Sequence, residues 1–349
     1  MPELPPRYIE MSTDPVCSSL PLRSLNAPSG DHFIRNHFDP PVVTTSSWTV
    51  IVSGEVYNPI YLSYEKLLKL PPSQVLNVME CAGNSRLSIQ PPTVGVQWDH
   101  GAVGQAQWTG VLVKNIIDLV SPRQTVSDIL FEGGDCGKVL HCDKPVPFGI
   151  SIPISALIDN DAILAYRMNG SEIPLDHGYP VRLVMPSWYG MASVKWLKRM
   201  IFLNRPAETF HELDYRIYPA SDDINTPIPK RVTSLKTKAL ISEPSQGDVL
   251  YRGIHKITGI AWSGEASITR VDISTDGNKT WLPAELEDPT GSYSLQRWNY
   301  DWCAATIGNF LISCRATDDC GYTQPVLPNW NFRGYEVNSI HSISIQVSD

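Results

Sequence analysis

Proline is the sequence feature that most restricts the fold of this chain. The 349 residues include 29 prolines and 23 glycines, together about 15% of the chain against a usual share of roughly 12%. A proline inside a helix removes a backbone hydrogen bond and clashes with the preceding turn. We therefore expect many turns, few long helices and a soluble globular chain built mainly from short strands.

Charge and hydropathy exclude several classes of partner. The formal net charge is -8, with 36 acidic and 28 basic residues, whereas nonspecific binding to nucleic acid or to an anionic membrane needs a basic face. No apolar run approaches the roughly 18 residues of a membrane span, and the N-terminus lacks the basic and then apolar order of a signal peptide. These observations predict a soluble, cytoplasmic protein without a nucleic-acid or membrane partner.

The cysteines do not resemble a disulfide framework. There are 7 of them in 349 residues, an odd and sparse number, and disulfide-rich domains carry many closely spaced pairs. We therefore expect most of them to be reduced thiols.

The first two thirds of the chain have an α+β texture. Residues 1–30, rich in Pro and Ser, are predicted to form an extended arm, and order is expected to begin near Phe33. Residues 31–230 then form the first domain, in which a strand over 48–53 precedes an amphipathic helix over 61–70. Apolar, β-branched segments predict further strands over 75–81, 181–185 and 194–203.

The texture changes after a polar, aperiodic segment over residues 204–238, which is typical of an interdomain connection. Apolar and polar residues then alternate, and Asp276-Gly277 falls where a hairpin turn is expected. Residues 231–349 are therefore predicted to form an immunoglobulin-like β-sandwich, with strands over 254–262, 268–274 and 310–316.

Cys81 is the first candidate for chemistry. It follows an apolar strand and precedes Ala82, Gly83, Asn84, Ser85 and Arg86. Two small residues that let backbone approach a ligand, with a cationic neighbour, suit a thiolate site. The alternative is a buried cysteine acting as a small hydrophobe, the commoner role of free cysteines. No Cys-x-x-Cys or paired histidine accompanies Cys81, which disfavours a zinc or iron-sulfur site there.

The segment 80–84, Glu-Cys-Ala-Gly-Asn, resembles the Cys-Ala-Gly-Asn signature of the sulfite oxidase family of molybdenum enzymes. Further motifs agree with that family in order over nearly the whole chain after residue 30, and the ordered series is specific where single motifs are not. They are Arg35-Asn36-His37, the segments 94–104 and 108–111, 164–170, 176–182 and 193–197, Asp214-Tyr215, and 330–334.

This resemblance implies a molybdopterin-binding domain followed by an immunoglobulin-like dimerisation domain, with the Cys81 thiolate as the molybdenum ligand. It implies an oxyanion pocket and catalytic group made of Arg35, Arg86, Trp98, Tyr166 and Arg333. It also implies a cofactor-binding set of Arg35, Asn36, His37, Cys81, His177, Arg182, Ser193, Val194 and Lys195. Arginines suit a small dianion because they give bidentate hydrogen bonds and keep their charge.

The function implied is oxidation of sulfite to sulfate at a molybdenum-molybdopterin cofactor, in a homodimer. The segment before Arg35 is too short for a haem domain, so we expect no haem, and an external acceptor such as oxygen or a cytochrome takes the electrons. Two alternatives stay open at this point. One is a related molybdenum enzyme acting on another small substrate, such as an S- or N-oxide. The other is a cofactor-free oxyanion-binding module.

Each site residue also has an ordinary structural interpretation. Arg35 and Arg86 could form surface salt bridges, Trp98 and Tyr166 could be core aromatics, and His177 could be a turn residue. Arg333 belongs to the sandwich region, so its place in the pocket requires that region to fold back over the first domain.

The chain departs from the family pattern at two places. The sulfite-oxidising members generally have Arg where Ser85 stands, and an Ala-Arg pair where this chain has Met191-Ala192. Loss of these cations would weaken binding of substrate or cofactor phosphate. The divergent segment 131–144 holds Cys136, His141 and Cys142, but it lacks a fourth ligand and the spacing of a zinc site.

Overall fold

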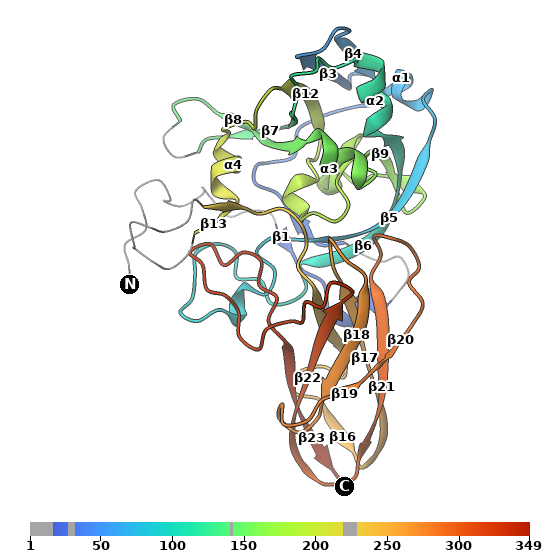
Figure 1. The fold of residues 1–349 in the computed structure, drawn as a ribbon, viewed down its shortest axis with the longest axis vertical. Helices are drawn as coiled ribbons and strands as arrows, with labels where there is room; N and C mark the ends of the chain where they lie inside the picture. Colours follow the sequence, from blue (N-terminus) through green and yellow to red (C-terminus); the bar gives the residue numbers. More distant parts are fainter. Residues whose placement is uncertain (1–16, 27–31, 140–141, 219–228) are drawn as a thin grey trace.

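The computed structural model describes residues 17–26, 32–139, 142–218 and 229–349. Figure 1 shows two stacked domains, the first carrying every labelled helix and the second built of strands. The longest α-helix among the described residues has 8 residues, which confirms the expectation of few long helices. None of the described helices is long and apolar enough to cross a membrane. The α-helices are α1 (Tyr64–Leu68), α2 (Val113–Val120), α3 (Ile154–Asp159) and α4 (Phe210–Asp214). Four 3₁₀ turns are η1 (Leu22–Asn26), η2 (Arg86–Ser88), η3 (Leu175–His177) and η4 (Gly190–Ala192).

Two sheets of five strands form the first domain. One has the order β10-β9-β6-β5, with β11 also paired to β9, and the other has the order β4-β3-β12-β7-β8. The first comprises β5 (Ser73–Glu80), β6 (Val103–Leu112), β9 (Ile163–Met168), β10 (Ser171–Glu172) and β11 (Arg182–Val184). The second comprises β3 (Thr49–Gly54), β4 (Ile60–Ser63), β7 (Asp128–Gly137), β8 (Val146–Pro153) and β12 (Leu197–Leu203). Only β12 and β3 pair in parallel within these two sheets, so this domain has the expected α+β character.

The second domain packs a sheet of order β15-β17-β21-β20 against one of order β16-β23-β22-β18-β19. The first contains β15 (Lys238–Glu243), β17 (Gly253–Trp262), β20 (Glu285–Leu286) and β21 (Gln296–Ala304). The second contains β16 (Val249–Tyr251), β18 (Ile268–Ser274), β19 (Leu282–Pro283), β22 (Gly308–Asp318) and β23 (His341–Ser348). Strands β18 and β19 are antiparallel and enclose Asp276-Gly277, as the predicted hairpin requires. The immunoglobulin-like sandwich is confirmed.

Two predicted elements are shorter than expected. The helix predicted over 61–70 begins at Tyr64, because residues 60–63 pair with β3 as a strand. The strand predicted over 194–203 begins at Leu197, because Trp196 has φ 47° and turns the chain. Lys195 therefore lies in a loop, where its side chain is free to enter a cavity.

Part of the N-terminal arm docks on the folded body, so order begins earlier than Phe33. Strand β1 (Cys17–Ser18) pairs with β2 (Ile34–Arg35), and the Leu20 amide donates to the Gly101 carbonyl at 2.9 Å. The remainder of the arm lies outside the described residues.

The hydrophobic core of the first domain continues into the second. Leu240, Ile260, Trp262 and Leu295 of the sandwich belong to the same buried cluster as the first-domain core, while the sandwich interior has its own cluster. The two domains are therefore joined by apolar packing as well as by the chain.

Two substitutions on one strand test this shared core. Ile260 is fully buried and Ile254 is 77% exposed, both on β17. Ile260→Ala should lower the free energy of unfolding by about 2–5 kcal/mol, and Ile254→Ala should change it by less than about 0.5 kcal/mol. Calorimetry should show one transition that shifts as a whole in Ile260→Ala. Two separable transitions would contradict a shared core.

Candidate active site

One cavity gathers polar side chains from several separate segments. It is bordered by strand β2, with which the arm strand β1 pairs, by the end of β5, by the loop after η4 and by the residues that follow α4. The lining residues are His32, Phe33, Arg35, His37, Met79, Cys81, Ala82, Asp135, Phe148, His177, Arg182, Gly190, Met191, Ser193, Lys195 and Tyr215.

Cys81 lies at this cavity, immediately after β5. Its amide donates to the Ala102 carbonyl, and its carbonyl accepts from the Asn84 amide, both at 2.9 Å. The side chain is a free thiol of intermediate exposure. The cysteine is therefore held by backbone hydrogen bonds at the cavity wall and is not an enclosed core residue.

Arg182 carries a buried positive charge without a carboxylate partner among the described residues. Its guanidinium donates to the carbonyls of His177 at 2.7 Å, Ser193 at 2.8 Å and Leu183 at 3.3 Å. Desolvation by burial lowers the pKa of Arg182 to about 9, so the side chain remains cationic at neutral pH. The guanidinium also contacts the Met79 sulfur at 3.6 Å and lies 4.9 Å from the centre of the Trp108 ring, so all of these partners are uncharged, and a buried cation among uncharged partners attracts an anion.

Lys195 adds a second buried cation. Its ammonium donates to the carbonyls of Asp176 at 2.8 Å and Arg35 at 3.2 Å, and to the Asn36 side chain. Burial and the charge of Arg182 hold the pKa of Lys195 well below its usual value. Gly178 has φ 106° and lies against both side chains, so a residue with a Cβ would be strained there.

Burial is the main cause of the pKa shifts of the histidines and the acid at the cavity, and the positive charges of Arg182 and Lys195 contribute to them. Burial, followed by Arg182 and Lys195, lowers the pKa of His177 to about 4. Burial, followed by His177, lowers the pKa of His32 to about 3. Burial raises the pKa of Asp135 to about 7 although Lys195 opposes the shift. The cavity therefore suits a ligand that brings negative charge, such as a phosphate.

Tyr215 and His37 form a hydrogen-bonded pair at the cavity, with 2.7 Å between the tyrosine hydroxyl and the His37 Nε2. Burial raises the pKa of Tyr215 well above its usual value, and burial and Arg35 hold the pKa of His37 well below its own. Both groups are thus neutral at pH 7. The pair can hold or pass a proton next to Arg35.

The structure brings most of the predicted cofactor-binding residues together. Arg35, His37, Cys81, His177, Arg182, Ser193 and Lys195 all line the cavity. Asn36 lies behind the lining and accepts from Lys195, and Val194 is buried in the adjacent core. His177 is also the turn residue that the sequence allowed, at the end of η3.

Tyr166, predicted as a catalytic group, packs into the core of the first domain. Side chains alternate along β9, so Leu164 and Tyr166 point into one hydrophobic core while Ile163 and Ala165 point into another. Tyr166 is not among the described residues that line the cavity, and the tyrosine that lines it is Tyr215. The sequence signal for Tyr215 was the Asp214-Tyr215 motif, to which no role was attached.

Arg86 and Arg333 lie next to the cavity lining. The Arg86 Nε donates to the Arg333 carbonyl at 2.9 Å, and its guanidinium lies 5.5 Å from the centre of the Tyr335 ring. Tyr335 stacks on Tyr215 with 5.3 Å between ring centres. The segment between β22 and β23 therefore does fold back over the first domain, as Figure 1 also shows.

Asp214 explains the position of the Arg333 side chain. Its carboxylate pairs with the Arg333 guanidinium and accepts from the Tyr335 hydroxyl at 3.4 Å. Neither Arg86 nor Arg35 forms a salt bridge within the described part of the chain. Trp98 is a core aromatic, in a cluster against which Cys81 packs.

The two departures from the family pattern have different consequences. Met191 lines the cavity, whereas Ala192, which stands where the family has the arginine of that pair, is buried, and neither Ala192 nor Ser85 is among the described lining residues. The divergent segment contributes Asp135 to the cavity, a residue that the sequence did not single out. Cys136 and Cys142 are exposed, His141 lies outside the described residues, and no group of three metal-binding side chains occurs among the described ones.

Comparison with known proteins agrees with this arrangement. Residues 37–211 match the family model of the oxidoreductase molybdopterin binding domain, and residues 230–348 match that of the Mo-co oxidoreductase dimerisation domain. The chain belongs to the sulfite oxidase family. It is an enzyme of the molybdenum oxidoreductase class.

Relatives in this family differ in substrate. The chain is 32% identical to mouse mitochondrial sulfite oxidase over 92% of its own length and 61% of the mouse protein. It is 31% identical to chicken sulfite oxidase, over 86% and 69% of the two chains. It is 28% identical to the NADH nitrate reductase of tomato, over 96% and 40%. The chain thus spans about three fifths of the mouse relative.

A solved structure shares the fold over nearly the whole chain. The sulfane dehydrogenase SoxCD of Paracoccus pantotrophus superposes with a TM-score of 0.82 at 24% identity, covering 98% of this chain and 90% of that one. At this identity the similarity establishes the two-domain fold of the family.

His211 provides a test of the electrostatics behind the cavity. It is fully buried among Phe38, Phe148 and Phe210, and neither ring nitrogen has a hydrogen-bond partner within the described structure. Burial, followed by Arg35, lowers the pKa of His211 to about 3. As the pH falls from 7 to 5, the unfolded histidine, whose ordinary pKa is about 6.5, binds a proton that the folded one does not.

Proton binding by the unfolded chain lowers the free energy of unfolding as the pH falls. The substitution His211→Phe should remove this loss of stability. Between pH 7 and pH 5 the wild type should lose about 2 kcal/mol more unfolding free energy than the variant. Urea unfolding of both proteins at the two pH values gives the comparison. Equal losses would mean that His211 becomes protonated in the folded protein.

Proposed function

We propose that this protein oxidises sulfite to sulfate at a molybdopterin-bound molybdenum whose protein ligand is Cys81. The observation that carries the proposal is the cavity itself, which Cys81 lines together with the buried basic side chains Arg182 and Lys195, neither of which forms a salt bridge within the described chain. The overall change is sulfite plus water to sulfate, two protons and two electrons. When bound, the molybdenum centre supplies the two-electron redox chemistry.

The residues present fit the cofactor in charge and in donor type. Arg182 and Lys195 would bind its phosphate, because both are buried basic side chains and neither forms a salt bridge within the described structure. The Ser193 carbonyl and the Asn36 side chain fix the positions of these two cations. A soft thiolate ligand from Cys81 suits a transition metal.

Arg35, His37 and Tyr215 are the groups that we assign to the substrate. Arg35 lines the cavity and would neutralise a sulfite dianion through charge-assisted hydrogen bonds. Arg86 and Arg333 would add positive electrostatic potential at the substrate from outside the cavity lining. They lie on the far side of the stacked rings of Tyr335 and Tyr215. The hydrogen-bonded hydroxyl of Tyr215 and imidazole of His37 would accept and pass on the two protons that the reaction releases.

The electrons would leave one at a time to an external acceptor, either oxygen or a cytochrome. We also propose that the enzyme is a homodimer, because residues 230–348 match the dimerisation domain of the family. A solution mass of twice the 38.8 kDa chain mass is the expected result.

Metal analysis and a sulfite assay on one sample test the assignment of Cys81. Protein made in a cell that synthesises the cofactor should contain about one molybdenum per chain, because one thiolate ligand serves one metal. Cys81→Ser should lose most of the metal, whereas Cys303→Ser, at an exposed site in the sandwich, should keep it. Full metal loading without sulfite turnover by any acceptor, or turnover with nitrate instead, would overturn the substrate assignment.

Two tyrosine substitutions test the assignment of Tyr215. Tyr215→Phe keeps the stacked ring but removes the hydroxyl that bonds His37, so kcat for sulfite should fall about 100-fold with molybdenum content unchanged. Tyr166→Phe should leave kcat within about twofold, because this hydroxyl belongs to a core aromatic. Loss of activity in Tyr166→Phe and not in Tyr215→Phe would reverse our assignment. Steady-state kinetics with molybdenum-normalised enzyme give both values.

A further inference from the structure

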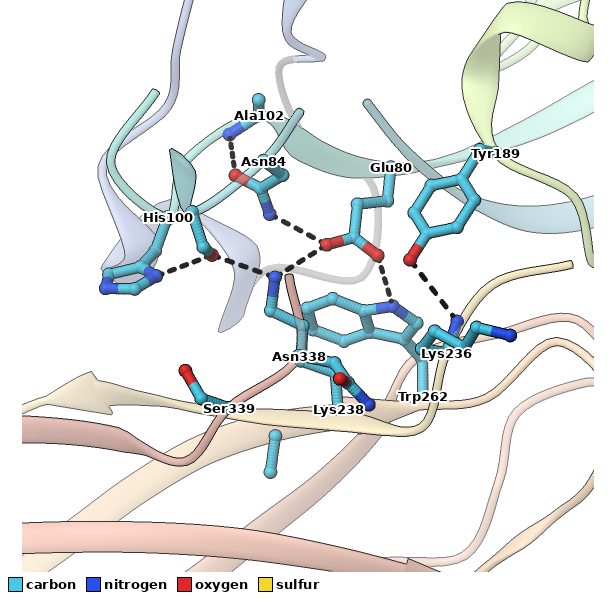
Figure 2. Close-up of polar contacts among 12 residues, drawn as sticks. Glu80, Asn84, His100, Ala102, Tyr189, Lys236, Lys238, Trp262, Asn338 and Ser339 are labelled. Atoms are coloured by element: carbon cyan, nitrogen blue, oxygen red, sulfur yellow. Dashed lines mark hydrogen bonds and ion pairs between the residues drawn. The ribbon is translucent and has the colours of Figure 1, made fainter. Parts of the chain in front are cut away.

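A lysine of the second domain is buried beneath the loop that carries Cys81. Lys238, at the start of β15, is 1% exposed, and its ammonium donates to the Glu80 carboxylate and to the Ser85 hydroxyl, each at 2.8 Å. Figure 2 shows the Lys238 ammonium next to the Glu80 carboxylate. One cation from the sandwich thus holds residues on both sides of Cys81.

Both oxygens of the Glu80 carboxylate accept hydrogen bonds in this network. Besides Lys238, it accepts from the Asn84 amide group and from the Trp262 indole, both at 3.0 Å. The Asn84 carbonyl oxygen in turn accepts from the Ala102 amide at 3.0 Å. Since the Ala102 carbonyl accepts from the Cys81 amide, the side-chain network is connected to the Cys81 backbone through Ala102, whose bond to Asn84 is drawn in Figure 2.

Ser85 closes the other side of the loop. Its φ of 67° is unusual for a residue with a side chain, and its amide donates to the Asp99 carbonyl at 2.6 Å. Its hydroxyl also contacts the His100 Nδ1 at 2.7 Å. A short side chain at this position leaves room for Lys238, whose ammonium takes up the space behind the loop.

The network lies behind the cavity wall. Lys238, Glu80 and Ser85 are absent from the described cavity lining, so contact with substrate or cofactor does not account for the buried charges. Burial of an ion pair costs desolvation energy that its geometry must offset. In return, the pair fixes the geometry of the loop between β5 and η2.

We propose that Lys238 is a positioning residue through which the second domain sets the orientation of the Cys81 thiol. The inference rests on the proposed role of Cys81 as the metal ligand. Ligand-orienting partners outside the coordination sphere commonly change metal affinity or activity by about 10- to 100-fold. Here the partner acts through Glu80 and Ser85, which flank the ligand in the sequence.

The experiment compares three variants with the wild type. Lys238→Met removes the charge and keeps the aliphatic stem, but it leaves the Glu80 carboxylate buried without its cation. Glu80→Gln with Lys238→Met removes both charges and keeps an acceptor for Trp262, so most of the lost thermal stability should return. Asp272→Asn is the matched control, because Asp272 is a buried acid with two arginine partners inside the sandwich.

Two readouts report on Cys81 apart from activity. The first is the rate at which iodoacetamide alkylates Cys81 in the metal-free protein, followed by peptide mass spectrometry because other cysteines are exposed. The second is the rate of molybdenum loss from the loaded protein during dialysis. In both Lys238 variants we expect each rate to rise about tenfold. Asp272→Asn should match the wild type in both.

The double variant decides the outcome. Faster alkylation and faster metal loss in a double variant of near wild-type melting temperature support the proposal. Wild-type rates in that variant, or equally raised rates in Asp272→Asn, overturn it and leave the network a purely structural one. If the wild type binds no molybdenum, the proposed function fails, whereas the alkylation rates still test the positioning of Cys81.

Discussion

The ion pair between Lys238 and Glu80 is the contact on which the relation of the two domains depends. Both side chains are withdrawn from water, and separating the domains would leave each charge buried alone or force it back into solvent. The hydrophobic surface around the pair, including Trp262, adds a nondirectional contribution. Charge therefore fixes the register of the interface, and apolar burial supplies its stability. The cavity that Cys81 lines is assembled next to this interface.

Basic side chains from separate segments of the chain meet at the cavity. Strand β2 contributes Arg35, the loop before β12 contributes Lys195, and the short strand β11 contributes Arg182. Burial lowers the pKa of Arg182, and burial together with the charge of Arg182 lowers the pKa of Lys195. Such a site is poorly stabilised until an anion enters it, and this conflict is typical of functional centres.

Much of the fold could be predicted from the sequence because it depends on local patterns. The proline excess predicted short helices, and alternation predicted the strands of the sandwich. The ordered motifs predicted seven of the sixteen residues that line the cavity, including Cys81, Arg182 and Lys195. Tyr166 is not among the described lining residues, because a motif gives the residue type but not the face of a strand. Tyr215 and Asp135 were missed because they lie in segments interpreted as a connection and as a divergent region, and their proximity to Cys81 arises only from tertiary packing.

The shared interface also restricts how such a protein can be recombined. The family models divide the chain between residues 211 and 230, but the energetic boundary does not follow this division. A chimera that took its sandwich from a relative would have to bring a partner for Glu80 and a residue that fits beside Ser85. The unit that can be exchanged is therefore the sandwich together with the loop over residues 80–102. Sequence variation in β15 and in that loop is expected to be correlated, even though the two segments are more than a hundred residues apart.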